Sequence, residues 1–148
     1  MIVAANISDA KELTEIAIKS KAFWGYSRKL IDSWTDDLTI TDKIINTMYV
    51  YNFIEKNMIV GFYVLNEPSN NNVELEFLFV LPKFIGKGFG KELLLHAFKK
   101  AKKLNCISIT LLADPNAIKF YSLHGFYQIG KKDSSIPGRF LPILKKDF

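Results

Sequence analysis

The sequence predicts an α+β fold around one mostly antiparallel sheet, and three observations lead to it. β-branched and aromatic residues gather in three runs between residues 47 and 80. Only turn-sized polar segments separate these runs, which favours consecutive antiparallel strands. A helical period of apolar residues follows from about Gly90 to Leu104. A fourth β-rich run at 106–112 comes after this helix, and a strand that returns through a whole helix pairs in parallel with the strand before it.

The composition is that of an ordinary globular protein, and we expect a single domain over residues 1–148. Hydrophobic residues make up 49% of the 148 residues, enough to bury one core. No window approaches ~18 uninterrupted apolar residues, and the N-terminus lacks the positive start and apolar length of a signal peptide. Cys106 is the single cysteine, so it forms no internal disulfide and offers no paired metal ligand. These features predict a cytoplasmic protein with no bound metal and no membrane segment.

The net charge of +5 is unevenly distributed along the chain. Seven lysines lie close together between residues 83 and 103. A cluster of this kind attracts a polyanion, either nucleic acid or the phosphates of a nucleotide cofactor. A nucleic-acid surface would have aromatic residues interleaved with the basic ones, and few are present here. We therefore expect a nucleotide cofactor and no nucleic-acid partner. The clustered lysines are Lys83, Lys87, Lys91, Lys99, Lys100, Lys102 and Lys103.

The first part of the chain predicts a short strand and two helices. Residues 2–5 can begin a sheet, and Ser8 and Asp9 offer an N-cap to a helix expected over residues 9–22. An aromatic turn occupies 23–27, and its last residue, Ser27, can cap a second helix. Two short helices joined by aromatic residues commonly form the wall of a pocket.

The next segment predicts three strands joined by tight connections. β-forming residues fill 47–55 and 58–65, which a two-residue turn joins, and a third strand occupies 73–80. In this third strand Glu74 and Glu76 alternate with apolar residues. Because side chains of a strand alternate between its faces, both carboxylates lie on one face.

The stretch 80–95 carries the strongest chemical signal. The strand ends before Pro82, which cannot donate to a sheet ladder, and a helix begins near Gly90. Gly86, Gly88 and Gly90 remove every second Cβ, so backbone N–H groups can converge on an anion at the positive end of the helix. A Walker loop needs four residues between its glycines and then Lys-Ser/Thr, and the dinucleotide fingerprint needs a third glycine three residues after the second. Neither spacing is present, so a phosphate-binding loop of another kind remains.

A short helix with both ends signalled follows the fourth β-rich run. Asp114 fits the N-cap, Pro115 the first helical position, and Gly125 the position just past the end. Tyr121 lies within this helix.

These segments together resemble the GNAT superfamily of acyl-CoA-dependent N-acyltransferases. The loop of that family reads Gln/Arg-x-x-Gly-x-Gly/Ala; here Gly88 and Gly90 match, and Ile85 stands in the Gln/Arg position. The second signature of the family, Ala-x-x-x-Tyr-x-x-x-Gly-Phe, is matched at every named position over 117–126. The Trp-Gly-Tyr turn and the tail at 134–144 resemble one subgroup, so the resemblance covers nearly the whole chain.

The resemblance implies a GNAT-like fold, with a mostly antiparallel central sheet, one parallel and splayed strand pair, and helices on both faces. It also implies acetyl-CoA as cosubstrate, with the pantetheine arm in the gap between the splayed strands and no metal. Ile85 removes a side-chain contact to the phosphates, and Asp114 stands where the family often has Asn, which leaves Asn116 or the backbone for that contact. The residues expected to hold the cofactor are Phe79, Val80, Ile85, Gly86, Lys87, Gly88, Phe89, Gly90, Lys91, Asn116, Lys119 and Tyr121.

The implied reaction is direct transfer of the acetyl group to a primary amine. An alkylamine with a pKa near ~10 arrives protonated, and Glu76 or Glu74 could accept its proton through water, with Glu76 nearer the loop. By resemblance, a backbone N–H near Phe79 or Val80 would meet the negative charge that develops on the carbonyl oxygen. Tyr121 would protonate the departing thiolate; its alternative role is in the core, because its helix is largely apolar.

Three residues are candidates for contact with the acceptor. Trp24 and Tyr26 lie in a segment that lines the acceptor site of the resembled family, although they could instead only staple two helices together. Arg139 could pair with an acidic group of the acceptor or with an internal carboxylate. The sequence leaves open which small-molecule or peptide amine is the acceptor, how long the acyl group is, and whether the protein is a monomer or a homodimer. A catalytically silent acyl-CoA-binding module of the same fold is the alternative to an enzyme.

Overall fold

The structure is a computed structural model that describes residues 1–148. The elements of its first half are β1 (Ile2–Ala4), a 3₁₀ turn (Ile7–Asp9), α1 (Ala10–Ala22), α2 (Arg28–Ser33), α3 (Thr35–Leu38), α4 (Asp42–Thr47), β2 (Tyr49–Glu55), β3 (Met58–Leu65) and β4 (Asn72–Val80). Those of its second half are a 3₁₀ turn (Pro82–Phe84), α5 (Phe89–Lys103), β5 (Ser108–Leu112), a 3₁₀ turn (Pro115–Ala117), α6 (Ile118–Ser122), β6 (Tyr127–Asp133) and β7 (Phe140–Asp147).

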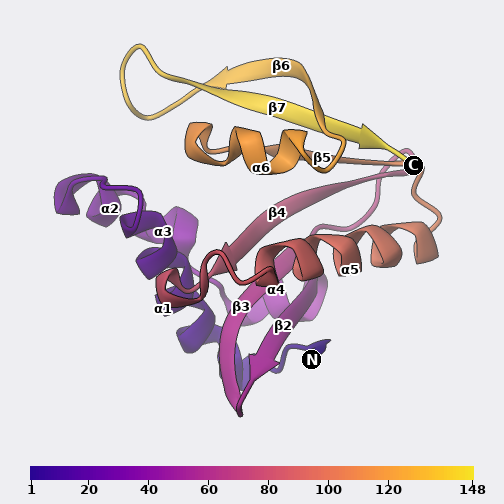
Figure 1. Ribbon diagram of the computed structural model, residues 1–148, viewed down its shortest axis with the longest axis horizontal. Helices are drawn as coiled ribbons and strands as arrows, with labels where there is room; N and C mark the ends of the chain where they lie inside the picture. Colours follow the sequence, from indigo (N-terminus) through magenta and orange to yellow (C-terminus); the bar gives the residue numbers. More distant parts are fainter.

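Seven strands form one twisted sheet in the order β1-β2-β3-β4-β5-β7-β6 (Figure 1). Every neighbouring pair is antiparallel except β4 and β5, which are parallel. The predicted α+β fold, with a mostly antiparallel sheet and one parallel pair, is confirmed.

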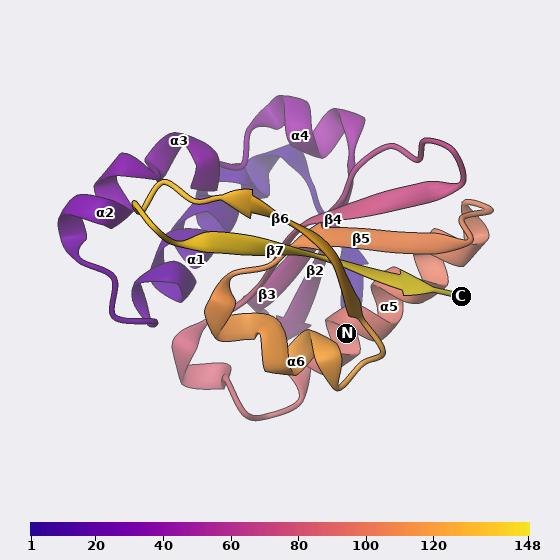
Figure 2. The same cartoon turned by 90° about the horizontal axis from the view of Figure 1, so that it is seen from above.

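Helices cover both faces of the sheet, as Figure 2 shows with α1 to α4 on one side and α5 and α6 on the other. The central strand β3 supplies both hydrophobic clusters, and seven of its eight residues are buried. Phe62 and Val64 pack with the α1 side, while Tyr63 and Leu65 pack with the α5 side. The helical period predicted for α5 is also confirmed, since its buried residues are Leu93, Leu94, Ala97, Phe98 and Ala101.

The strands β4 and β5 part soon after they meet. They pair over three residues only, Asn72–Glu74 with Ser108–Thr110, although β4 continues to Val80. Beyond that point β5 pairs only with β7, so the edge of β4 that faces β5 is unpaired over its second half. This opening positions the candidate site.

The strand β6 forms one edge of the sheet and pairs with β7 only. Six of its seven residues are exposed, so β6 contributes little to the core. No helix of the chain combines the length and apolar character that crossing a bilayer requires.

The structure corrects several expectations about individual elements. It contains α3, α4, β6 and β7, none of which the sequence patterns predicted. The strand expected from Thr47 begins at Tyr49 because 42–47 form α4, and the strand expected from Cys106 begins at Ser108 after a turn at Asn105 with φ 64°.

The predicted helix caps have mixed outcomes. The hydroxyl of Ser27 accepts the backbone N–H of Leu30 at 3.2 Å, as predicted. The carboxylate of Asp9 does not cap α1; it instead accepts from the backbone N–H of Asn6 and from the amide of Asn52. The predicted turn between β2 and β3 is confirmed, because Lys56 and Asn57 have φ values of 49° and 62°, which suit a two-residue hairpin loop.

Candidate active site

A cavity of about 870 Å³ opens where β4 and β5 part. One end is formed by the glycine loop, and the other by the C-terminal end of α1 together with the connection between β6 and β7. The second half of β4, the end of β5 and one side of α6 form the walls between these ends. The cavity therefore joins both motifs that the sequence singled out.

The glycine loop forms an open cradle at one end of this cavity. Gly86 and Gly88 have φ values of 84° and 86°, which L side chains rarely adopt, and no atom lies within 4 Å of the place where a Cβ would be. Both precede the N-terminus of the 15-residue helix α5, where unpaired N–H groups favour an anion. Gly90 differs, since it lies within α5 and a Cβ there would meet Phe120 at 3.7 Å.

Most residues expected at the cofactor line the cavity, but three do not. Lys87 lies over the ring of Phe84, Phe89 packs between the rings of Phe53 and Phe84, and Lys119 lies outside the lining. The expected residues that line the cavity are Phe79, Val80, Ile85, Gly86, Gly88, Gly90, Lys91, Asn116 and Tyr121.

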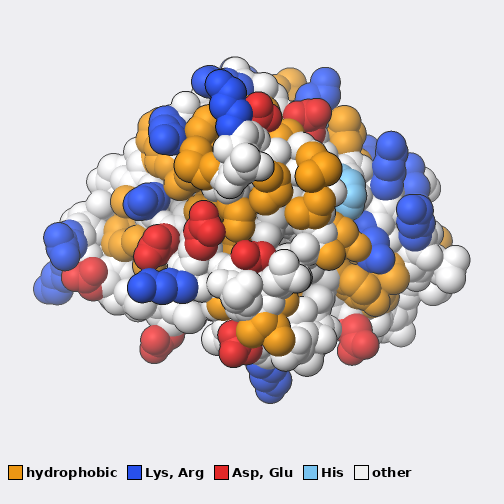
Figure 3. Space-filling view, turned by 90° about the horizontal axis from the view of Figure 1, so that it is seen from below, with side chains coloured by type: hydrophobic (Ala, Val, Ile, Leu, Met, Phe, Trp, Pro, Cys, Tyr) orange, Lys and Arg blue, Asp and Glu red, His pale blue; other side chains and the backbone are white.

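The lysine cluster divides into two groups along α5. Lys91 lines the cavity, whereas the four lysines at 99–103 lie more than two turns further along the helix. Figure 3 shows Lys and Arg side chains gathered at the α5 side of the face seen from below. None of these four forms an ion pair within the chain. At 1.5 Å rise per residue they are too far from the loop to belong to its cradle.

The backbone of β4 presents free groups to the cavity. The N–H of Leu81 donates to the carbonyl of Val60 at 2.8 Å. Because such bonded pairs alternate along antiparallel strands, Phe79 also faces β3, while Leu78 and Val80 direct their N–H and C=O groups away from it. The carbonyl of Val80 accepts the hydroxyl of Ser20 at 2.8 Å, which agrees with this alternation. Of Phe79 and Val80, therefore, only Val80 directs its N–H to the side that β5 has left.

Glu74 and Glu76 both line the cavity, and neither forms an ion pair within the chain. Val64 of β3 pairs with Phe77 of β4, but the next residue of β3 pairs with Leu75. Glu76 therefore has no partner on β3 and is the extra residue of a β-bulge. Partial burial raises the pKa of Glu76, and the charge of Glu74 raises it further. A carboxylate with a raised pKa is a better proton acceptor than an ordinary surface glutamate.

Tyr121 is buried on α6 and lines the same cavity. Its ring packs against those of Phe120 and Phe126. The hydroxyl of Tyr121 forms no hydrogen bond within the chain, and it is not among the fully buried atoms that lack a partner, so part of its surface is accessible. Burial raises the pKa of Tyr121, which keeps the phenol protonated.

Trp24 and Tyr26 occupy different places in the structure. Trp24 lines the cavity with 42% of its surface exposed. Tyr26 is not part of the lining; its ring packs edge-on against Trp34 at 4.9 Å. Its hydroxyl donates to Asp114 at 2.9 Å and accepts from Arg139 at 2.5 Å. Tyr26 thus ties the turn between α1 and α2 to the rest of the site.

Arg139 lines the cavity but forms no ion pair with a carboxylate of the chain, which corrects the expectation of an internal acid–base pair. Its guanidinium donates to the hydroxyls of Tyr26 and Ser134 instead. Tyr26 is 113 positions from Arg139 in the sequence, so no local sequence pattern could have predicted that Arg139 bonds to it.

Two charged residues of the site, Lys21 and Asp114, show no sign of their pairing in the sequence. Lys21 and Asp114 form an ion pair of 2.5 Å and both line the cavity. Burial opposes ionisation of Asp114, but hydrogen bonds from Lys21, the backbone of Asn116 and Tyr26 outweigh it and lower its pKa. Asp114 also caps the following turn as predicted, accepting the N–H of Asn116 at 2.9 Å. The cap signal in the sequence hid this second role.

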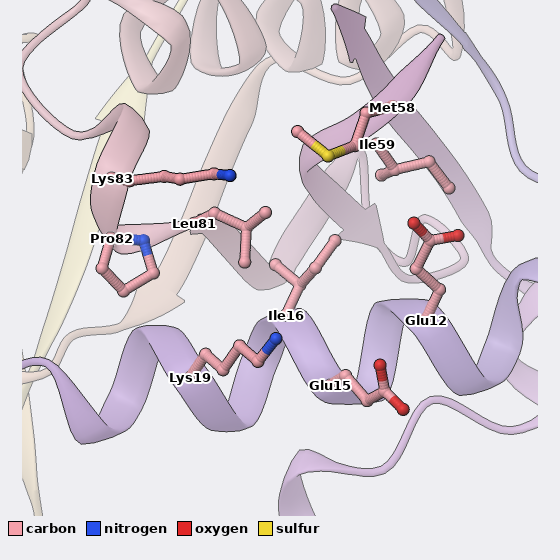
Figure 4. Close-up of a pocket in the computed structure, with 9 residues that line it drawn as sticks. All are labelled: Glu12, Glu15, Ile16, Lys19, Met58, Ile59, Leu81, Pro82 and Lys83. Carbon is pink, nitrogen blue, oxygen red and sulfur yellow. The ribbon is translucent and has the colours of Figure 1, made fainter.

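A second, smaller cavity of about 420 Å³ lies on the other side of α1 (Figure 4). Lys19 and Lys83 extend into it from one end, and Glu12 lies at the opposite end. It shares no lining residue with the larger cavity and reaches neither the glycines nor Tyr121. Nowhere does the chain bring together three or more His, Cys, Asp or Glu side chains that could hold a metal ion.

Comparison with known proteins gives consistent matches. A model of the acetyltransferase (GNAT) family matches residues 11–126. An uncharacterized N-acetyltransferase, ycf52, from Gracilaria tenuistipitata var. liui is 27% identical over 89 residues, which are 60% of this chain and 49% of that protein. The match thus spans about half the length of this curated relative.

Two solved structures are similar over larger shares of both chains. The PaiA N-acetyltransferase from Thermoplasma acidophilum, in complex with coenzyme A, is 26% identical with a TM-score of 0.85, covering 100% of this chain and 98% of that one. A putative streptothricin acetyltransferase from Bacillus anthracis str. Ames, in complex with acetyl coenzyme A, is 28% identical with a TM-score of 0.65, covering 72% and 67%.

Proposed function

The chain belongs to the acetyltransferase (GNAT) family, and from this premise we propose that it transfers the acetyl group of acetyl-CoA directly to a primary amine. The observation that carries the proposal is the single cavity that runs from the glycine loop past Glu76 to Tyr121. An anion cradle, a base and a proton donor thereby share one space. Transfer from a thioester to an amine needs little more than these groups and good positioning.

The residues present fit coenzyme A. The relatives from T. acidophilum and B. anthracis hold coenzyme A and acetyl-CoA. In this chain Gly86 and Gly88 leave room for phosphate to approach the backbone, with Lys91 beside them. The side chain of Ile85 cannot donate a hydrogen bond, so the phosphates would depend on backbone N–H groups of the loop and on Lys91. The pantetheine arm would lie where β4 leaves β5, because unpaired backbone groups there need partners. When bound, acetyl-CoA supplies a thioester carbonyl for the amine to attack.

Glu76 is the proposed general base. An alkylamine with a pKa near ~10 must lose a proton before it can attack. Glu76 lines the cavity in a bulge of β4, has no competing ion pair, and has a raised pKa. It would accept the proton directly or through one water, with Glu74 as the neighbouring carboxylate that strengthens its basicity.

Val80 and Tyr121 have the remaining proposed roles. The N–H of Val80 would donate to the carbonyl oxygen as negative charge develops on it, since this group is free of β3 and lies where β5 has parted. Tyr121, kept protonated by its raised pKa, would give a proton to the leaving sulfur. The acceptor would enter at the other end of the cavity, beside Trp24 and Arg139.

Two measurements on the purified protein test the proposal. Calorimetry measures acetyl-CoA binding, and a thiol reagent follows coenzyme A release with a panel of n-butylamine, benzylamine, L-lysine, kanamycin and short peptides. Binding together with amine-dependent thiol release supports the enzyme. Binding without release by any amine would favour a silent acyl-CoA-binding module of the same fold. Failure to bind acetyl-CoA would overturn both.

A further inference from the structure

A chain of hydrogen bonds closes the acceptor end of the cavity. Lys21 donates to Asp114 at 2.5 Å, Tyr26 donates to Asp114 at 2.9 Å, and Arg139 donates to Tyr26 at 2.5 Å. The amide of Asn116 donates to both Tyr26 and Asp114, at 3.2 and 3.0 Å. We name Lys21, Tyr26, Asp114, Asn116 and Arg139 the Asp114 network.

The Asp114 network joins α1 and the turn after it to the neighbouring ends of the paired strands β5 and β7. Lys21 and Tyr26 belong to α1 and the turn after it, Asp114 and Asn116 follow β5, and Arg139 precedes β7. The antiparallel pairing of β5 with β7 already holds Asp114 near Arg139, whereas no strand pairing ties α1 and its turn to either of them. One further side-chain hydrogen bond, of 2.6 Å from the Trp34 indole to Ser135, links the helical region after α1 to the connection between β6 and β7.

Asp114 is the centre of the Asp114 network. Its side chain is 10% exposed, and its two oxygens accept from Lys21, Tyr26 and both nitrogens of Asn116. The hydroxyl of Tyr26 has one proton, which it gives to Asp114, so its oxygen is free to accept from Arg139. Helix capping alone would need only the hydrogen bond from the backbone N–H of Asn116, and a neutral asparagine in place of Asp114 could accept that bond equally well.

We propose that Asp114 is a positioning residue for the acetyl acceptor, which rests on the function proposed above. Its carboxylate fixes Lys21 and Tyr26, and Tyr26 in turn fixes Arg139 against the cavity. The ring of Trp34 is held by the same arrangement, with Lys21 at 5.4 Å and Arg139 at 6.0 Å from its centre. The charge of Asp114 therefore determines the shape of the wall that the acceptor meets, while the cradle for acetyl-CoA lies at the other end.

Tryptophan fluorescence reports this wall directly, because the chain has two tryptophans and both line the cavity at this end. In a Trp24→Phe background the emission belongs to Trp34 alone. Asp114→Asn keeps the shape and the cap but removes the charge, and we expect Trp34 emission to move to longer wavelength and acrylamide quenching to increase. The matched control is Asp36→Asn, the same change at an exposed residue two positions from Trp34, which should leave the emission unchanged.

Turnover supplies a second measurement with the fastest amine of the panel of n-butylamine, benzylamine, L-lysine, kanamycin and short peptides. We expect Asp114→Asn to raise the KM for that amine about tenfold, with the acetyl-CoA affinity within about twofold of the parent. Lys21→Met should shift the emission similarly, and the double variant should add little, because both changes break one pair.

Unchanged emission and an unchanged amine KM in Asp114→Asn, with a lower melting temperature in Asp114→Ala, would reduce Asp114 to a helix cap and overturn the proposal. If Asp114→Asn does not fold, Tyr26→Phe breaks the next link while leaving the Lys21 pair intact; unchanged Trp34 emission there would equally overturn it. Absence of turnover with every amine would count against the proposed function. The fluorescence measurement needs no substrate, so it tests the role of Asp114 separately from the proposed function.

Discussion

Glu76 is the proposed general base, and its surroundings in the cavity make that role testable. It has a raised pKa and no ion pair. Glu76→Gln should lower kcat/KM near pH 7 by about 10²-fold or more, because loss of a general base typically costs that much. Activity should recover as the pH approaches ~10, where the amine deprotonates without help. A pH–rate profile with acetyl-CoA and an active amine measures this.

Glu74, the carboxylate nearest in sequence to Glu76, supplies a matched control. Because a protonated Glu76 cannot act as a base, its raised pKa places the acid limb of the parent profile above the ordinary ~4.3. Glu74→Gln removes one cause of the raised pKa, so the acid limb should move to lower pH. An equal loss of activity at every pH in Glu76→Gln would show that the side chain is structural.

Tyr121 is tested by removing one oxygen. Tyr121→Phe keeps the ring against Phe120 and Phe126, and no hydrogen bond is lost, so the melting temperature and acetyl-CoA affinity should hardly change. Turnover should fall ~10²–10⁴-fold, about 3–5 kcal/mol of transition-state stabilisation. Turnover within about threefold of the parent, or ~0.7 kcal/mol, is too small an effect for a general acid and would remove Tyr121 from the mechanism.

At the scale of elements, the glycine loop is the most testable. Gly88→Val places a branched side chain in the open cradle, and we expect acetyl-CoA affinity to fall at least tenfold, about 1.4 kcal/mol. Gly25→Val is a matched control, because Gly25 has φ 85° and equally open surroundings but lies away from the loop. Both variants should lose similar stability, since a side chain in the left-handed region costs about 1–2 kcal/mol. Calorimetry that finds equal affinity in both would refute the cradle.

The elements that the sequence predicted are those with local signals. The hairpin of β2 and β3, the helix α5 and the cap at Asp114 each depend on residues close in sequence. The missed helices α3 and α4 have four and six residues, too short to show a helical period. The missed β6 is exposed on both faces, so its side chains do not alternate, and Pro142 within β7 argues against a strand.

The site was predictable in the same uneven way. The glycines and Tyr121 stand in motifs, and the structure brings them and both glutamates to one cavity. The strict alternation expected around the glutamates is wrong, because the bulge at Glu76 turns Leu75 to the α5 side and Phe77 to the α1 side. Their catalytic and binding roles stay predictions. The Asp114 network could not be predicted, because its hydrogen bonds join residues up to 113 positions apart and no local pattern records such pairing.

For the whole molecule, Asp114 links pH to stability. The pKa of Asp114 is lower in the folded than in the unfolded protein. Its contribution to the free energy of unfolding is therefore fully present above the unfolded pKa of ~3.9, and it is lost as the pH falls through the folded pKa. Asp114→Asn should reduce the free energy of unfolding by about 1–3 kcal/mol at neutral pH, and this difference should shrink below pH ~3.9. Urea denaturation across pH measures it.

The exposed Asp36 again provides the control for this measurement. Asp36→Asn removes the same charge without an ion pair, so its stability curve should run parallel to that of the parent. A difference between Asp114→Asn and the parent that stays constant down to acid unfolding would mean that the charge of Asp114 adds nothing to stability.

The unequal burial of the strands implies that the chain does not open as one unit. Amides of β3, covered on both faces, should exchange with deuterium only through global unfolding, whereas those of the exposed edge strand β6 should exchange through local fraying. Mass spectrometry of peptides after a deuterium pulse would reveal the order. Because β6 pairs with β7 alone while β7 is held by β5, fraying of β6 would loosen the connection that carries Arg139 and widen the acceptor entrance while the central strands stay protected.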